Sequence, residues 1–191
     1  MSGFIWAAAA AIFWLLGSLL LHIGFCQWRR VAESLVVAGC LVIGVYIAFL
    51  WIELGHAPLR TVGETRLWYS ALLASTGVAL FLYWNMLWIQ SYSLAVAALF
   101  LGLNLMHPEA LDRVLMPALR SPWFVPHVVV YLEGYALLTA ATLVAVRGLV
   151  QSRAAEAQEL LERADRMVQL GYGFVSLGLL FGALWAKTAL S

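Results

Sequence analysis

The 191-residue chain is strongly apolar, since 64% of its residues are hydrophobic and only 11% are charged. Its mean hydropathy of +0.90 lies well above that of a soluble domain, which excludes a water-soluble monomer. The net charge is +1 and no basic tract occurs, so nothing points to nucleic-acid binding. Two cysteines cannot build a disulfide scaffold, and the sequence has no CxxC or CxxCH motif for covalent haem attachment.

The first two predicted membrane spans flank a pair of arginines. Residues 4–25 form an apolar stretch that, at roughly 1.5 Å per residue, crosses a hydrocarbon core of about 30 Å. No Lys or Arg precedes this stretch, so it lacks the charged n-region of a signal peptide and we expect it to remain in the protein. Arg29 and Arg30 follow it, and residues 34–51 form the second span.

A long uncharged stretch follows, at residues 67–106. As a single helix it would reach about 60 Å and overshoot the bilayer, so it must fold back once. Its polar cluster, Q-S-Y-S at residues 90–93, is where we predict a tight turn. That turn would separate a third span at residues 67–88 from a short fourth span at residues 94–106.

The last two predicted spans are residues 127–146 and 168–190, with an amphipathic juxtamembrane helix at residues 151–166 that extends span six. Two pairs at i,i+4 spacing would each stabilise that helix by about 0.3 kcal/mol: Glu159 with Arg163, and Glu162 with Arg166. The sequence therefore predicts an all-α, polytopic membrane protein of about six transmembrane helices, forming a single transmembrane domain over residues 1–191.

The distribution of Lys and Arg predicts the orientation. An even number of spans puts both termini on one side of the membrane. With the N-terminus outside, the inner connections carry six Lys or Arg and the outer ones five, and the pair Arg29 and Arg30 favours this arrangement. We therefore predict a multi-pass protein of the inner (cytoplasmic or equivalent energy-transducing) membrane with both termini on the outer side.

Most of the potential ligand residues have a structural interpretation. His22 lies near the inner end of the first span, where an interhelical hydrogen bond is the favoured role. We expect His56 and His107 to be solvated on outer connections, and Cys26 and Cys40 to be free, packed thiols.

His127 differs from these because Pro126 precedes it at the outer mouth of the fifth span. An imidazole at that place can face an external ligand, and Trp123 and Phe124 offer aromatic surface beside it. From the residue types alone, a ligand role and a structural role both stay open.

Glu133 lies six residues after His127, about 9 Å deeper in the same span. An ionised carboxylate there costs several kcal/mol unless it is protonated or paired. The two side chains point about 120° apart, so we do not expect one site. Glu133 is a candidate for proton or partner binding, with a protonated structural carboxylate as the alternative. We expect Asn85 and Asn104 to hydrogen-bond between helices.

A stripe of small residues runs along the sixth span, at Gly171, Gly178 and Gly182, with Trp185 next on the same face. Gly178 and Gly182 form a GxxxG unit. The stripe predicts close packing against another helix.

Three stretches carry motifs. The first is G-H-A-P-L at residues 55–59, followed by Glu64, and the third is G-A-L-W-A at residues 182–186. The second is P-A-L-R-S-P-W at residues 117–123, followed by His127-Val128 and by G-Y-A-L-L at residues 134–138. Together they resemble the cytochrome c assembly family of System II, membrane haem-handling proteins with a tryptophan-rich external WWD segment. The resemblance covers the chain from about Gly55 onward.

The resemblance implies a polytopic helical fold with an outward-facing haem site. His127 matches the external histidine that precedes the WWD segment, so the resemblance implies haem as cofactor, His127 as a ligand of the haem iron, and Trp123 as part of the cofactor-binding surface. Gly63 and Thr65 replace the Tyr and Ser of the family pattern, and Glu133 replaces an apolar residue.

The family continues beyond the position of Ser191 into the WWD segment, a membrane histidine and a second external histidine. Three interpretations stay open: these parts lie on another chain, the printed sequence is a piece of a longer one, or the protein is a divergent relative with another use.

The resemblance implies a haem-handling component of cytochrome c maturation, which presents haem at the outer membrane face to apocytochrome together with a partner chain. The alternative is a non-catalytic membrane anchor subunit of a larger respiratory or redox complex with the same fold, contacting quinone or haem. Both are transport, assembly or anchor roles rather than that of a stand-alone enzyme. The expected partners are other membrane subunits, including a chain that supplies the WWD segment, and apocytochrome c or a redox partner.

Overall fold

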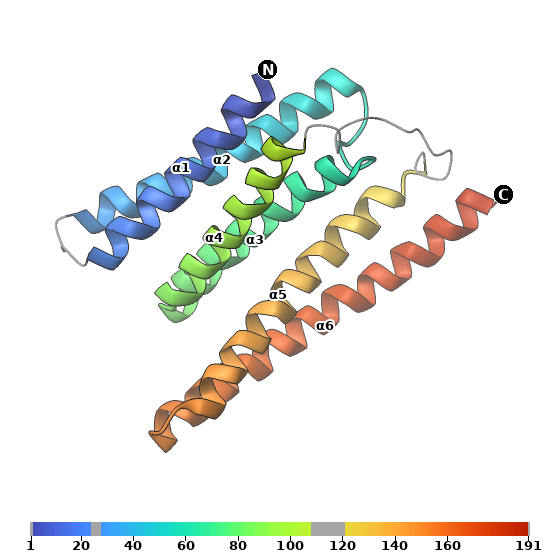
Figure 1. Ribbon diagram of the computed structural model, residues 1–191. Coiled ribbons are helices and arrows are strands. Elements are labelled where there is room, and N and C mark those ends of the chain that lie inside the picture. Colours follow the sequence, from blue (N-terminus) through green and yellow to red (C-terminus); the bar gives the residue numbers. More distant parts are fainter. Residues whose placement is uncertain (1, 24–27, 108–120, 191) are drawn as a thin grey trace. The chain divides into compact units, whose positions relative to one another are not determined.

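The computed structural model describes residues 2–23, 28–107 and 121–190, and these residues form six α-helices (Figure 1). The helices are α1 (Ser2–Ile23), α2 (Arg29–Leu54), α3 (Val62–Trp84), α4 (Leu87–Met106), α5 (Phe124–Val150) and α6 (Ala154–Leu190). Each of the six is long and apolar enough to cross a membrane. The predicted all-α, polytopic membrane fold is therefore confirmed. The predictions for Cys26 and for residues 117–120 of the second motif lie outside the described residues.

The helices fall into two compact units, residues 1–115 with α1 to α4 and residues 116–191 with α5 and α6. The single transmembrane domain over residues 1–191 thus stays a prediction.

In the first unit, α1 packs against α2 and α4, and α3 packs against α4. The helices approach closely at glycines. A Cβ at Gly39 would lie 2.6 Å from Cδ1 of Trp14, and one at Gly77 would lie 2.6 Å from the Cβ of Ser93. Trp14 is fully buried at this α1–α2 contact. Small residues therefore let large ones fill the space between helices, as is usual inside a membrane where lipid competes poorly with tight packing.

The G-H-A-P-L motif forms the connection between α2 and α3. Gly55 ends α2 with a φ of 66°, a left-handed conformation that favours glycine. Thr61 then begins α3 with a capping box: its side chain accepts from the Glu64 backbone N–H at 3.1 Å, and the Glu64 carboxylate accepts from Arg60 N–H at 2.8 Å and Thr61 N–H at 3.2 Å. These bonds explain why a carboxylate that is only 4% exposed is tolerated here.

The predicted turn at residues 90–93 is wrong. The chain reverses at Asn85, which adopts a φ of 54° and caps α3 by donating its backbone N–H to the Phe81 carbonyl at 2.7 Å. Gln90 and Ser93 are instead buried within α4, where they pack on Gly77. Their polarity therefore marks a close helix contact and not a loop.

As a consequence, α4 has 20 residues and is not a short span. Asn85, predicted to bond between helices, is a helix cap instead. Asn104 does link helices as predicted, because its Nδ2 donates to the Gly63 carbonyl at 2.8 Å.

In the second unit, α5 and α6 form a helical hairpin and lie side by side along their lengths (Figure 1). Helix α6 has 37 residues, about 55 Å, so the predicted juxtamembrane helix is its continuous first part. The predicted ion pair of Glu159 and Arg163 is present. Glu162 accepts from Gln158 at 2.9 Å in place of the predicted pairing with Arg166.

The α1–α2 contact yields a matched pair of substitutions. Gly39→Ala puts a Cβ against the Trp14 indole and 3.1 Å from the Ala10 carbonyl oxygen, and we expect it to lower the free energy of unfolding by about 1–3 kcal/mol. Gly44→Ala on the same helix meets nothing within 4 Å, so it should be neutral or stabilising by up to about 1 kcal/mol. Thermal unfolding in detergent measures both. Equal midpoints for the two variants would contradict the packing described here.

Candidate functional site

The α5–α6 hairpin is joined along a seam of glycines. A Cβ at Gly134 would lie 3.2 Å from the Gly171 carbonyl oxygen, so the two backbones nearly touch. Toward the chain end of α6, Gly178 faces the ring of Tyr131, and Gly182 faces that of His127. The predicted glycine stripe therefore does pack closely against another helix, and it does so by receiving aromatic rings of α5.

His127 lies across this seam in a fixed orientation. Its Nδ1 is 2.8 Å from the Gly178 carbonyl oxygen. A carbonyl oxygen only accepts, so Nδ1 carries the hydrogen and the Nε2 of a neutral ring carries a lone pair. Nε2 makes no hydrogen bond with any described residue. This atom is also not fully buried by the described residues. The lone pair is therefore accessible to an outside ligand.

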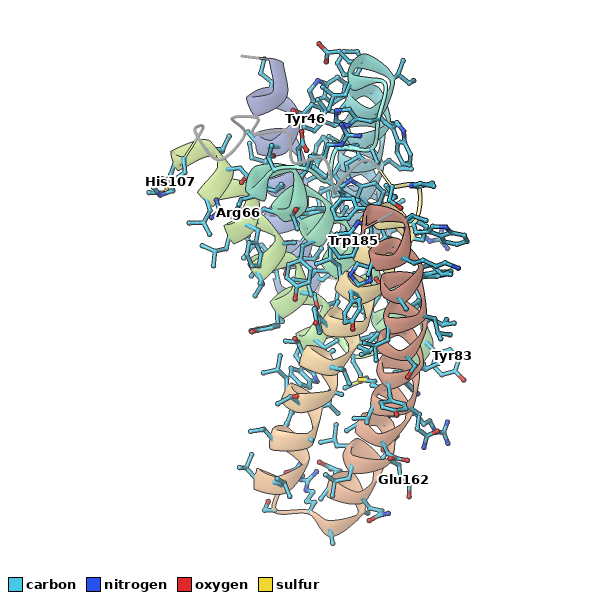
Figure 2. All side chains as sticks on the ribbon, turned by 90° about the vertical axis from the view of Figure 1, so that its right-hand side faces the viewer. Tyr46, Arg66, Tyr83, His107, Glu162 and Trp185 are labelled. Atoms are coloured by element: carbon cyan, nitrogen blue, oxygen red, sulfur yellow. The ribbon has the colours of Figure 1, made fainter. Side chains whose placement is uncertain are left out.

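Aromatic rings enclose the imidazole. The indole of Trp185 is stacked on it, with centroids 5.6 Å apart and planes inclined by 14°. The Tyr131 ring meets it edge-on at 4.9 Å. Figure 2 shows Trp185 on α6, toward the opposite end of that helix from Glu162. These contacts hold the plane of the imidazole ring.

Trp123 belongs to the same end of the hairpin. It is stacked on Phe181 at 6.0 Å, one helical turn before Trp185 on α6, and is 37% exposed. Phe124 contacts Trp185 at 5.9 Å. A hydrogen bond of 2.5 Å between the Ser121 and Thr188 hydroxyls joins the two chain segments beside them. The ring contacts at this end of the hairpin form two groups, Trp123 with Phe181, and His127 with Tyr131, Trp185 and Phe124, and we call these six residues together the aromatic cluster.

Glu133 lies on the same helix as His127, six residues further along. It is half-buried on α5 and has an interaction partner. Six residues turn the helix by about 600°, so the two side chains leave α5 in directions about 120° apart. The two residues are therefore separate candidates, as the helical spacing indicates.

The other histidines have different settings. His22 Nε2 is 2.9 Å from the Ser91 hydroxyl, an α1–α4 link of the kind predicted for it. His56 is half-buried and its Nδ1 lies 3.0 Å from the Ala57 carbonyl oxygen, so it is less solvated than predicted. His107 is exposed at the end of α4. Cys40 is a free, half-buried thiol.

Sequence reasoning did not single out Tyr131 and Phe181, although the spacing contained a signal. Tyr131 follows His127 by four residues and Phe181 precedes Trp185 by four, so each pair shares one helix face. The Gly178 carbonyl, which fixes the tautomer, has no signal in the sequence because every residue offers a backbone carbonyl.

Comparisons with known proteins cover most of the chain. The sequence model described as "Cytochrome C assembly protein" matches residues 5–191. The chain is similar to the cytochrome c biogenesis protein CcsA of Guillardia theta, 23% identical over 184 residues that cover 80% of this chain and 61% of that protein. It is also similar to those of Cuscuta reflexa (25%, covering 73% and 57%) and Synechococcus sp. strain RCC307 (24%, covering 91% and 71%). The chain thus spans about three fifths of the length of the first two of these curated relatives.

The geometry at His127 predicts its tautomer and its sensitivity to Gly182. Nitrogen NMR of isotope-labelled histidine should show neutral His127 protonated at Nδ1. In Gly182→Ala the new Cβ lies 2.9 Å from Nδ1, so the ring must move and the preference for this tautomer should be lost. Gly173→Ala on the same helix meets nothing within 4 Å and should keep the wild-type spectrum. An unchanged His127 signal in Gly182→Ala would show that the seam does not orient the ring.

Proposed function

Because the chain belongs to the cytochrome c assembly protein family, we propose that it handles haem in cytochrome c maturation and presents haem at the outer membrane face to apocytochrome c. Haem is then the cargo, held between membrane helices and an acceptor protein. His127 is the proposed ligand of the haem iron, and Trp123 is part of the surface beside it.

The observation that carries this proposal is the hydrogen bond from His127 Nδ1 to the Gly178 carbonyl. Metal-ligating histidines almost always donate their second ring N–H to a carbonyl or carboxylate, which fixes the tautomer and raises the basicity of the ligating nitrogen. The bond leaves Nε2 as the lone-pair donor. An imidazole in this state is the usual axial ligand of haem iron.

The aromatic cluster suits a planar, largely apolar cargo. Trp123 is 37% exposed, and its indole is stacked on the Phe181 ring. Trp185 and Tyr131 fix the His127 ring, so it loses little freedom when it binds iron. Haem supplies redox chemistry once bound; the residues of this chain orient the imidazole and keep water from its flank.

A second axial group has to come from outside this cluster, since His127 supplies one nitrogen. We propose that a partner provides it, either a chain with the WWD segment or the apocytochrome itself. Other membrane subunits complete the assembly. We also propose an energy-transducing membrane with both termini on the outer side.

The names of the relatives favour this role over an anchor subunit of a respiratory complex. The relatives from Guillardia theta, Cuscuta reflexa and Synechococcus sp. strain RCC307 are all named cytochrome c biogenesis proteins.

The haem proposal predicts a clear loss in His127→Ala. Removing the Nε2 donor should lower the haem retained by the purified protein at least about tenfold, because even loss of an outer partner of a metal ligand costs 10–100-fold. Soret absorbance per mole of protein measures the retention. His107→Ala serves as control, since that exposed histidine is remote in sequence from the cluster. Unchanged haem content in His127→Ala would remove His127 from the site.

For Glu133 we propose proton or partner binding. Glu133→Gln keeps the shape and polarity of the side chain but cannot ionise or exchange a proton, so it should lower the yield of matured cytochrome c several-fold and leave the amount of membrane-inserted protein unchanged. Immunoblots of the membrane fraction and haem staining of cytochrome c report the two quantities. A parallel loss of both would identify a structural carboxylate.

A further inference from the structure

The first unit contains a groove that the haem proposal does not use. It lies between α2 and α3, has a volume of about 530 Å³, and has Gln90 of α4 among its lining residues. This size is that of a ligand pocket. The groove lies wholly in residues 30–90, apart from the cluster around His127 in sequence and in unit.

One part of the groove is apolar and faces outward. Val37 and Leu41 of α2 and Leu82 of α3 line it, and Leu41 and Leu82 are 64% and 75% exposed. In a membrane, such side chains meet hydrocarbon. From Arg30 to Leu41 the α2 wall runs about 16 Å, a length that suits an acyl chain.

The other part is polar, and its charged side chains sum to +1 when Arg29, which is paired with Glu33, is counted with Arg30 and Glu33. Arg30, Glu33 and Gln90 line the groove near the start of α2 and the start of α4. The Glu33 carboxylate is bonded to Arg29 at 2.8 Å, so its charge is already offset. Arg30 makes no hydrogen bond or ion pair with any residue that the structure describes.

Gln90 adds a second, independent sign of a ligand. It is only 2% exposed, and its Oε1 has no hydrogen-bond partner within the part of the chain that the structure describes. A buried amide oxygen without a donor is costly, above all in a membrane, unless something else supplies one. A side-chain amide can present either its oxygen or its NH₂ group to a ligand after a flip.

We propose that this groove binds an anionic glycerophospholipid, with the phosphodiester at Arg30, a headgroup or glycerol oxygen at Gln90, and one acyl chain along Val37, Leu41 and Leu82. The charge decides between amphiphiles. The Arg30 guanidinium, which forms no ion pair with a described residue, is complementary to the negative charge of a phosphodiester, whereas a quinone carries no charge. Basic pockets between membrane helices commonly bind acidic lipid headgroups. The proposal is independent of the role of His127.

The test is lipid retention by the 191-residue chain. The purified chain is stripped in detergent, offered dioleoyl-phosphatidylglycerol, dioleoyl-phosphatidylcholine or ubiquinone at equal mole fraction, and analysed by native mass spectrometry. We expect the wild type to retain phosphatidylglycerol about fivefold more than phosphatidylcholine, which is the preference that one basic residue provides.

Arg30→Gln should abolish this preference, and Arg30→Lys should keep part of it. Arg153→Gln is the matched control, because Arg153 is an exposed arginine outside the groove. Gel filtration verifies that each variant is folded. Equal retention of the two lipids by the wild type, an undiminished preference in Arg30→Gln, or retention of ubiquinone alone would each overturn the proposal.

Discussion

The hydrogen bond between His127 Nδ1 and the Gly178 carbonyl is possible because two residues of α6 are glycines, which have no side chain. Gly178 and Gly182 leave space for the rings of Tyr131 and His127, so the imidazole reaches the backbone of the neighbouring helix at 2.8 Å. A Cβ at Gly182 would occupy the place of the ring itself. Helices in lipid gain little from hydrophobic burial and hold together by such close approach. The same feature therefore joins α5 to α6 and sets the chemistry of the histidine.

The number and type of elements could be predicted from the sequence because the membrane limits the alternatives. A helix satisfies its own backbone, and a span needs about 20 apolar residues. The position of one turn could not be predicted. Q-S-Y-S at residues 90–93 has the composition of a loop, but these residues lie within a helix, where Gln90 and Ser93 pack closely against Gly77 of α3. Asn85 was the better signal, since asparagine tolerates the left-handed conformation that ends α3.

The site was predictable to the extent that side chains define it. His127, Trp123 and the glycine stripe stand out by type and position, and Glu64 by its motif. The structure explains why a glutamate stands at position 64, because its carboxylate accepts hydrogen bonds from backbone N–H groups at the start of α3. The roles of Tyr131 and Phe181 could not be predicted without knowing which faces of α5 and α6 pack together. The role of the Gly178 carbonyl could not be predicted either, since every residue type has a backbone acceptor.

The histidines show why residue type alone leaves a ligand role open. In His22 the Nε2 nitrogen is engaged by the Ser91 hydroxyl, so that imidazole serves to link α1 to α4. His56 and His127 both place Nδ1 on a carbonyl, at 3.0 Å and 2.8 Å. They differ in what lies around the ring: His56 bonds its own neighbour in a connection between helices, whereas His127 is stacked on Trp185 and bonded across two helices. A ligand needs a free nitrogen and a ring whose direction is fixed, because each freedom lost on binding weakens the complex. Among the histidines of the described residues, the structure gives this combination for His127, and the aromatic faces beside it add the surface that a planar cargo requires.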